Sequence, residues 1–175
     1  MATTIKRVGF GQVEPNHLSA QRNGKIYAQL PLDSSINILE NGQFMKYDYA
    51  NGKVDLTGEG EFMLVYNEVK VYSEKDTYKD FAMIKSEQVG GEIYPRLLKT
   101  DIGDIFTTNC VGAKNTSKDA EYAGVSLSVG DKLKVDTATG YLVKDSAGTA
   151  DMLWQVVKEY NMPDGQPAVK IQRVK

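Results

Sequence analysis

Residues 127–143 read Leu127-Ser128-Val129-Gly130-Asp131-Lys132-Leu133-Lys134-Val135-Asp136-Thr137-Ala138-Thr139-Gly140-Tyr141-Leu142-Val143. Within this stretch Leu133 and Val135 alternate with charged residues, and a period of two residues gives a β-strand one apolar face and one polar face. The turn-forming residues 137–140 then return the chain to a second strand that starts at Tyr141. The stretch therefore predicts an antiparallel hairpin.

The rest of the C-terminal third continues in the same way. Residues 153–157 and 168–174 are further strand patterns, and a turn at Pro163-Asp164-Gly165 separates them. Pro163 fixes φ at the first central turn position, and Gly165 accepts the positive φ that a hairpin bulge needs. We therefore expect a small antiparallel β-barrel or sandwich with no insertion for an active site.

The same pattern occurs once earlier in the chain. When residues 39–72 are laid without gaps on residues 127–160, the identical positions far exceed the roughly two that chance provides. Any two β-hairpins share glycine-rich turns, but an internal repeat explains the whole set better and predicts two similar lobes related by a pseudo-dyad. The identical pairs are Leu39/Leu127, Gly42/Gly130, Lys46/Lys134, Asp48/Asp136, Ala50/Ala138, Gly52/Gly140, Gly60/Gly148, Val69/Val157, Lys70/Lys158 and Tyr72/Tyr160.

Composition limits the class of protein. The 175 residues suffice for one good-sized domain or two small ones, and ten Tyr with 16 Gly favour strands and turns. A net charge of −2 without a basic block argues against binding to nucleic acid or to acidic membranes. Because Cys110 is the only cysteine, a disulfide framework and a cysteine zinc site are excluded. No apolar stretch has the length of a signal peptide or a membrane span, so we expect a cytosol-like compartment.

Four parts are expected along the chain. They are an extended N-terminal arm (1–34), a first β repeat (35–72), an intervening β segment packed with the repeats (73–122) and a second β repeat (123–175). The arm lacks a sustained helix or strand period, and we expect it to be ordered by packing, for example as a strand added to a neighbour's sheet edge.

The intervening segment predicts short strands and very little helix. The strands are expected at residues 81–84, 93–98 and 102–111, and Pro95 favours an edge position for the second of them. Weak helical turns are expected only around residues 116–122.

A search for catalytic residues finds little. His17 is the only histidine, and its place beside Pro15 in the arm favours a local hydrogen bond or a partner contact over a catalytic triad. Cys110 lies in an apolar strand pattern, where a buried inert thiol is expected. Neither glycine-rich motif, at residues 9–11 and 58–60, has the remaining residues of a phosphate loop. No cofactor and no metal are expected.

Carboxylates and aromatic residues leave three alternatives open. Asp101 with Asp104, or Asp131 with Asp136, offer oxygen ligands for calcium, although turn-capping is the better interpretation because no Asp-x-Asp-x-Asp-Gly loop occurs. A glycosidase pair of carboxylates is open in principle, but nothing selects one. An exposed aromatic face would bind sugars or single-stranded nucleic acid. The candidates for such a face are Tyr47, Tyr49, Tyr66 and Trp154. For most of them, burial in the core is the favoured interpretation.

The C-terminal pattern resembles the head decoration (capsid cement) proteins of tailed bacteriophages. The resembling stretches are residues 127–136, with a Gly-Asp turn that runs into a strand, Thr139-Gly140, residues 154–157 and the final strand in 164–171. The resemblance implies a non-enzymatic virion protein that binds the outer surface of an assembled capsid. It also implies a major capsid protein as partner, self-association, commonly as a trimer, and contacts through the N-terminal arm. The second copy and the long middle segment are departures from a minimal decoration protein.

The arm residues expected to contact the partner are spread over residues 10–27. We expect that deleting residues 2–30 leaves a folded protein that no longer binds capsids. The alternatives are another virion component (head-fibre base, neck or tail protein), a carbohydrate-binding β module and, least favoured, a small hydrolase. The contact candidates are Phe10, Gln12, Glu14, Asn16, His17, Leu18, Gln21, Arg22 and Tyr27.

Overall fold

The computed structural model describes residues 2–7, 9–18, 29–67, 82–112 and 124–175. Strands make up 44% of the structure, and the only helical elements in these residues are two 3-10 turns, η1 (Lys85–Glu87) and η2 (Val89–Gly91). The predicted all-β fold with very little helix is confirmed. The helical turns predicted around residues 116–122 lie outside the described residues. No described helix is long and apolar enough to cross a membrane.

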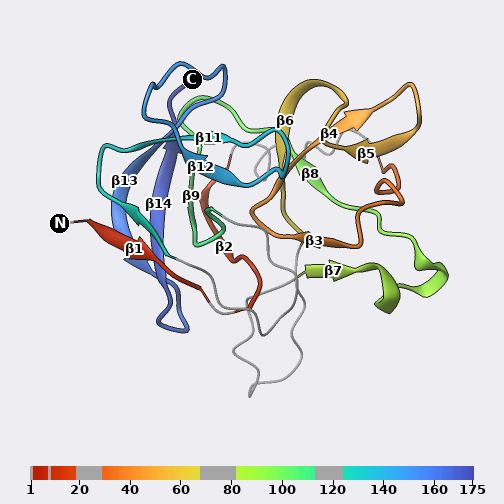
Figure 1. The fold of residues 1–175 in the computed structure, drawn as a ribbon, viewed down its shortest axis with the longest axis horizontal. Coiled ribbons are helices and arrows are strands. Elements are labelled where there is room, and N and C mark those ends of the chain that lie inside the picture. The colour runs from red at the N-terminus through yellow and green to blue at the C-terminus, as the bar shows by residue number, and fades with distance from the viewer. Residues whose placement is uncertain (1, 8, 19–28, 68–81, 113–123) are drawn as a thin grey trace.

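The first lobe contains two small antiparallel sheets (Figure 1). Its four-stranded sheet has the order β5-β4-β6-β8, and β3 pairs separately with β7. The strand bounds are β3 (Ile38–Glu40), β4 (Phe44–Asp48), β5 (Lys53–Asp55), β6 (Glu59–Val65), β7 (Ala82–Ile84) and β8 (Leu97–Leu98).

The second lobe has a larger sheet. Its six strands have the order β12-β11-β13-β14-β9-β2, and β10 pairs separately with β1. The strand bounds are β1 (Thr3–Ile5), β2 (Val13–His17), β9 (Ile105–Thr108), β10 (Val125–Leu127), β11 (Lys132–Val135), β12 (Leu142–Lys144), β13 (Trp154–Asn161) and β14 (Pro167–Arg173). The predicted turn between β13 and β14 is present, with φ of 87° at Gly165.

The internal repeat is visible in the hydrogen bonds. In the first lobe Gly42 N–H donates to Val65 O (3.0 Å), and in the second Gly130 N–H donates to Val156 O (2.8 Å). Both glycines lie between a short strand and the next one and have nearly the same φ, 93° and 95°. The three strands β5-β4-β6 therefore correspond to β12-β11-β13, and β3 corresponds to β10.

The ungapped alignment is wrong beyond β5. Strand pairing sets Met63 opposite Met45 and Trp154 opposite Leu133, so Trp154 corresponds to Met63 and not to Tyr66. The shift is three residues. The connection between β12 and β13 (residues 145–153) is longer than that between β5 and β6 (residues 56–58), and the pairing of β6 with β4 is irregular between Met45 and Tyr47.

The two lobes share one of two hydrophobic cores. Phe44 and Leu64 of the first-lobe sheet pack into the same cluster as Leu133 and Trp154, whereas their strand neighbours face a core inside the first lobe. Because successive strand residues point to opposite faces, β4 and β6 are buried on both sides. Leu64 and Val65, at the end of β6, are fully buried.

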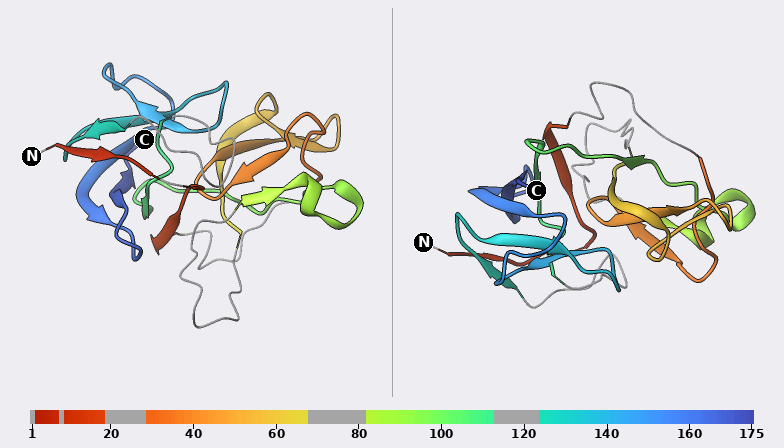
Figure 2. Two further views of the ribbon diagram at one scale, coloured as in Figure 1. Left: turned by 60° about the horizontal axis from the view of Figure 1, so that its bottom comes forward. Right: turned by 90° about the horizontal axis from the view of Figure 1, so that it is seen from above.

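The N-terminal segment is extended, but its strands join this chain's own sheets. β1 pairs with β10, and β2 forms the outer strand of the six-stranded sheet beside β9 (Figure 2). Figure 2 shows β2 running along the boundary between the lobes. For the described residues, the strand addition that we expected on a neighbour takes place within the chain.

Candidate functional site

The contact candidates of the N-terminal segment occupy different environments. Phe10, Gln12 and Leu18 are buried within the chain, at 6%, 0% and 2% exposure, and such side chains are not available to a partner in this conformation. Glu14 is half-buried on β2. Asn16 and His17 belong to the same outer strand, and Gln21, Arg22 and Tyr27 lie outside the described residues. Their contact with a partner stays a prediction.

Strand β2 ends the six-stranded sheet and carries a local irregularity. Val13 and Glu14 pair in register with Thr108 and Thr107, and the register shifts before His17. Pro15 within this strand has no N–H to donate, which suits an edge and reduces further pairing on its open side. Strand β2 is therefore held in the sheet by β9, and it forms the outer edge of that sheet.

A buried ionic cluster joins the N-terminal segment to both lobes. Arg7 Nη1 donates to Glu40 Oε2 at 2.6 Å, and both side chains are almost fully buried. Gly11 N–H donates to the same oxygen at 2.6 Å, and the hydroxyl of Tyr141 donates to Glu40 Oε1 at 2.5 Å. Glu40 belongs to the first lobe and Tyr141 to the second, so the carboxylate fixes their relative positions.

Burial controls protonation in this cluster. Burial raises the pKa of the Cys110 thiol to about 12, and the nearby Arg7 guanidinium only partly opposes this. Burial also raises the pKa of Tyr141, supported by the charge of Glu40. The thiol and the phenol are therefore neutral over the physiological range, and Cys110 is the inert thiol expected from its strand pattern.

Backbone contacts reinforce the boundary between the lobes. Phe44 N–H donates to Gly140 O at 2.7 Å, and Gln43 Nε2 donates to Thr139 O at 3.0 Å. The turn at residues 136–140 is itself held by Asp136, which accepts hydrogen bonds from Ala138 N–H and from the Thr139 hydroxyl. Together with the shared core, these contacts pack the two lobes against each other as one unit.

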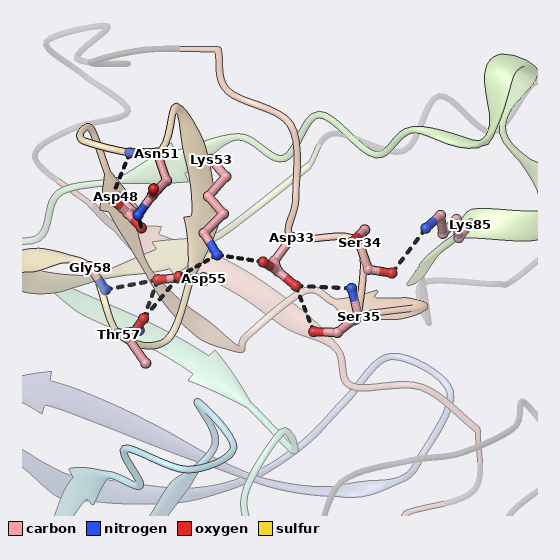
Figure 3. A network of polar contacts seen from close by, with 10 residues as sticks. All are labelled: Asp33, Ser34, Ser35, Asp48, Asn51, Lys53, Asp55, Thr57, Gly58 and Lys85. Carbon is pink, nitrogen blue, oxygen red and sulfur yellow. Dashed lines mark hydrogen bonds and ion pairs between the residues drawn. The ribbon is translucent and has the colours of Figure 1, made fainter.

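A polar network fastens residues 33–35 to the first lobe (Figure 3). Lys53 Nζ lies 2.6 Å from Asp33 Oδ2 and 3.4 Å from Asp55 Oδ2. The hydrogen bond from Lys53 lowers the pKa of Asp33, with further hydrogen bonds from Ser35. Asp55 accepts from Thr57 and from Gly58 N–H. Because these carboxylates cap turns and hold a lysine, the network is structural.

Hollows occur beside these features in the described part of the chain. One, of about 420 Å³, lies between residues 31–36 and residues 90–93 and adjoins the network of Figure 3. The other, of about 370 Å³, lies where β4 and β6 of the first lobe meet β11 and β14 of the second, and residues from both repeats line it. We refer to the second as the interlobe groove.

Other candidates from the sequence are part of the framework. The side chains of Asp104 and Asp131 accept backbone hydrogen bonds from Asp101 and Ser128, as in turns. Tyr47 and Trp154 are buried and Tyr66 is half-buried, so of the four aromatic candidates only Tyr49, at 62% exposure, is well exposed. Within the described part of the chain, no three His, Cys, Asp or Glu residues lie close enough to hold a metal ion.

The residues of the ionic cluster were not identified from the sequence. Glu40 is 33 positions from Arg7 and 101 from Tyr141, so local patterns do not connect them. One signal in the sequence could have indicated Glu40 as a buried charge. It directly follows the apolar pair Ile38-Leu39, in a strand that the repeat predicts to be buried.

Comparison with known proteins adds no assignment, because no family model, no curated protein and no solved structure matches this chain.

Proposed function

We propose that this chain is a non-enzymatic virion structural protein that binds the outer surface of an assembled bacteriophage capsid and stabilises the lattice of major capsid proteins. The observation that carries the proposal is the fused repeat, in which two lobes of one design are held as a single unit. A capsid lattice presents the same subunit surface at regular intervals. A chain with two similar lobes at a fixed spacing suits two neighbouring subunits.

The packed and hydrogen-bonded boundary between the lobes supports this role. Once one lobe is bound, the second binds with a high effective concentration if its position already matches the lattice. A rigid connection also avoids the entropy cost of ordering a flexible linker on binding. The buried contacts of Glu40 with Arg7 and Tyr141 supply such a connection.

The stabilising action follows from mass action. A protein that binds the assembled lattice and not the dispersed subunits shifts the equilibrium toward the lattice. The N-terminal residues that remain proposed as contacts are Glu14, Asn16, His17, Gln21, Arg22 and Tyr27. A trimer, as in resembling decoration proteins, remains part of the proposal.

Light scattering combined with co-sedimentation tests the proposal. The purified protein is expected to form a small defined oligomer and to sediment with capsids of the same virus that were assembled without it. It should not bind dispersed major capsid protein at the same subunit concentration. A protein that stays in the supernatant with such capsids would contradict the proposed function.

The deletion of residues 2–30 is not a clean test. It removes β1, Arg7 and β2, so it breaks pairing in both second-lobe sheets and leaves Glu40 buried without its cation. Glu14→Gln is a milder variant, because Gln removes the charge and keeps the side-chain shape at a carboxylate whose Oε2 is buried without a hydrogen-bond partner. Glu159→Gln, half-buried on β13, is its control. Loss of capsid binding only in Glu14→Gln would support a contact through β2.

A further inference from the structure

The interlobe groove combines charged and apolar side chains from both repeats. Its lining residues come from β4, β6, β11 and β14 and from the connections at residues 137 and 150–152. The two lysines that line it, Lys46 and Lys134, are corresponding residues of the repeat. A volume of about 370 Å³ is enough for one or two side chains of a bound segment.

The two lysines are only weakly neutralised. The ammonium of Lys46 lies 4.7 Å from the centre of the Phe62 ring and makes no ion pair with any described residue. Lys134 Nζ is 3.7 Å from Asp145 Oδ1, and its side chain is 45% exposed. An ammonium over an aromatic ring keeps its full charge, so both lysines can receive an anionic group.

The carboxylates of the groove are already bound or point to solvent. Glu61 accepts from Arg173 Nη2 at 2.8 Å and lies 3.4 Å from Lys99 Nζ. The side chain of Asp151 is fully exposed, and its contact with Lys175 is 3.9 Å long. Lys46 is therefore the groove cation without a carboxylate partner among the described residues, and Lys134 shares its charge with Asp145.

The same groove offers an apolar surface beside these charges. Phe62 is partly buried against the shared core, and Met152, at 8% exposure, is almost covered. A ligand that matches both features needs a carboxylate and, next to it, an apolar group. Free phosphate or another small inorganic anion would use only the lysines.

We propose that the interlobe groove binds the carboxylate of an acidic side chain of the protein partner, with an adjacent apolar residue packed against Phe62 and Met152. This inference rests on the proposed function, since the partner is then the major capsid protein. It assigns the contact to a surface that exists only where the two repeats meet. Charge complementarity with Lys46 and Lys134 is what selects an acidic segment as occupant.

A peptide titration tests the groove without capsids. The probes are the capped dipeptides N-acetyl-Phe-Glu-amide and N-acetyl-Phe-Gln-amide, which differ in the charge of one side chain. Binding is followed by the NMR signals of the Met152 methyl group and of the Lys46 and Lys134 backbone amides. We expect saturable shifts with the glutamate peptide, about tenfold weaker binding of the glutamine peptide (about 1.4 kcal/mol), and loss of the difference in Lys46→Met/Lys134→Met.

The control variant has matched chemistry outside the groove. Lys170 Nζ lies 5.4 Å from the centre of the Tyr160 ring, as Lys46 lies over Phe62, and Lys158 is an exposed strand lysine. Lys170→Met/Lys158→Met should therefore bind the glutamate peptide as the parent chain does. Equal binding of both peptides to the parent chain, or no binding of either, would overturn the inference, whatever the protein does with capsids.

Co-sedimentation with capsids separates the inference from the proposed function. If the parent chain binds capsids, Lys46→Met/Lys134→Met should weaken binding at least tenfold and reduce its dependence on salt, whereas the control variant should not. Capsid binding that is unchanged in the groove variant would overturn the assignment of the partner to this groove. If the parent chain ignores capsids but selects the glutamate peptide, the proposed function fails and the carboxylate site stands.

Discussion

Strands β4 and β11 occupy corresponding places in the two lobes but are buried differently. In β11 Leu133 and Val135 face the shared core, and the lysines on its other face are partly exposed. In β4 Phe44 faces the shared core while Met45 and Tyr47 face the first lobe's own core. The first-lobe sheet is therefore a middle layer, and the second-lobe sheet covers it on one side.

This difference shows what the repeat does and does not determine. It sets strand order and turn position in both lobes, because alternation and turn residues act locally. It does not set how many strands follow, since the second lobe recruits β14, β9 and β2 to reach six strands whereas the first ends at the two-residue β8. Four predictions use corresponding or adjoining positions to test this comparison.

The largest effect is expected at Trp154. Its ring lies 5.0 Å from that of Phe106 and 5.8 Å from that of Phe44, so it connects β13 to β9 and to the first lobe. Trp154→Ala should lower the free energy of unfolding by about 3–5 kcal/mol, and Met63→Ala at the corresponding position by about 2–3 kcal/mol. Urea denaturation measures both, and Val129→Ala on an exposed turn is the control. Equal losses in the two lobes would contradict the shared-core description.

The next effect concerns the buried ion pair at the boundary between the lobes. Arg7→Met leaves the Glu40 carboxylate buried without its cation and should cost about 3 kcal/mol. Adding Glu40→Leu to Arg7→Met should recover part of this loss, because no buried charge is then left unpaired. A double-mutant cycle by chemical denaturation measures the coupling. Strictly additive losses would mean that the pair does not connect the segments as described.

Corresponding glycines give a smaller contrast. Gly52 and Gly140 both have positive φ, at 64° and 75°, but a Cβ at Gly140 would lie 2.4 Å from Phe44 O, whereas one at Gly52 would meet nothing. Gly52→Ala should cost about 1 kcal/mol for its backbone conformation alone. Gly140→Ala should cost about 2–3 kcal/mol because the lobes must also separate slightly. Thermal denaturation compares the two, and equal costs would argue against the close contact.

The last prediction is a pH dependence of stability from Cys110. An unfolded cysteine has a pKa of about 8.5, whereas burial raises the folded value to about 12. Above about pH 8.5 the unfolded state binds fewer protons than the folded state, so stability falls between these two values. At pH 10 the loss should be about 2 kcal/mol relative to Cys110→Ala. The free energy of unfolding is measured by urea denaturation from pH 7 to 10. The same pH dependence of this free energy in the parent chain and in Cys110→Ala would contradict the prediction.

The fold was largely predictable from the sequence, and the candidate site was not. Strand alternation around Leu133 and the glycines at 42, 52, 130 and 140 act through neighbouring residues, so they are readable in the chain. Which residues meet Glu40 depends on long-range packing, which no local pattern encodes. The described strands of the N-terminal segment are extended, but backbone pairing depends little on side chains, so the sequence did not identify β9 and β10 as their partners.

The central proposal is that the two similar lobes of this chain bind neighbouring subunits of a capsid lattice as one unit. A cryo-electron microscopy reconstruction of capsids saturated with this protein tests it most directly. The account predicts density on the outer lattice surface in which the two lobes of each chain lie over two adjacent capsid subunits, with the interlobe groove facing the capsid. Density confined to a vertex or tail, or a chain that touches a single subunit through one lobe, would contradict it.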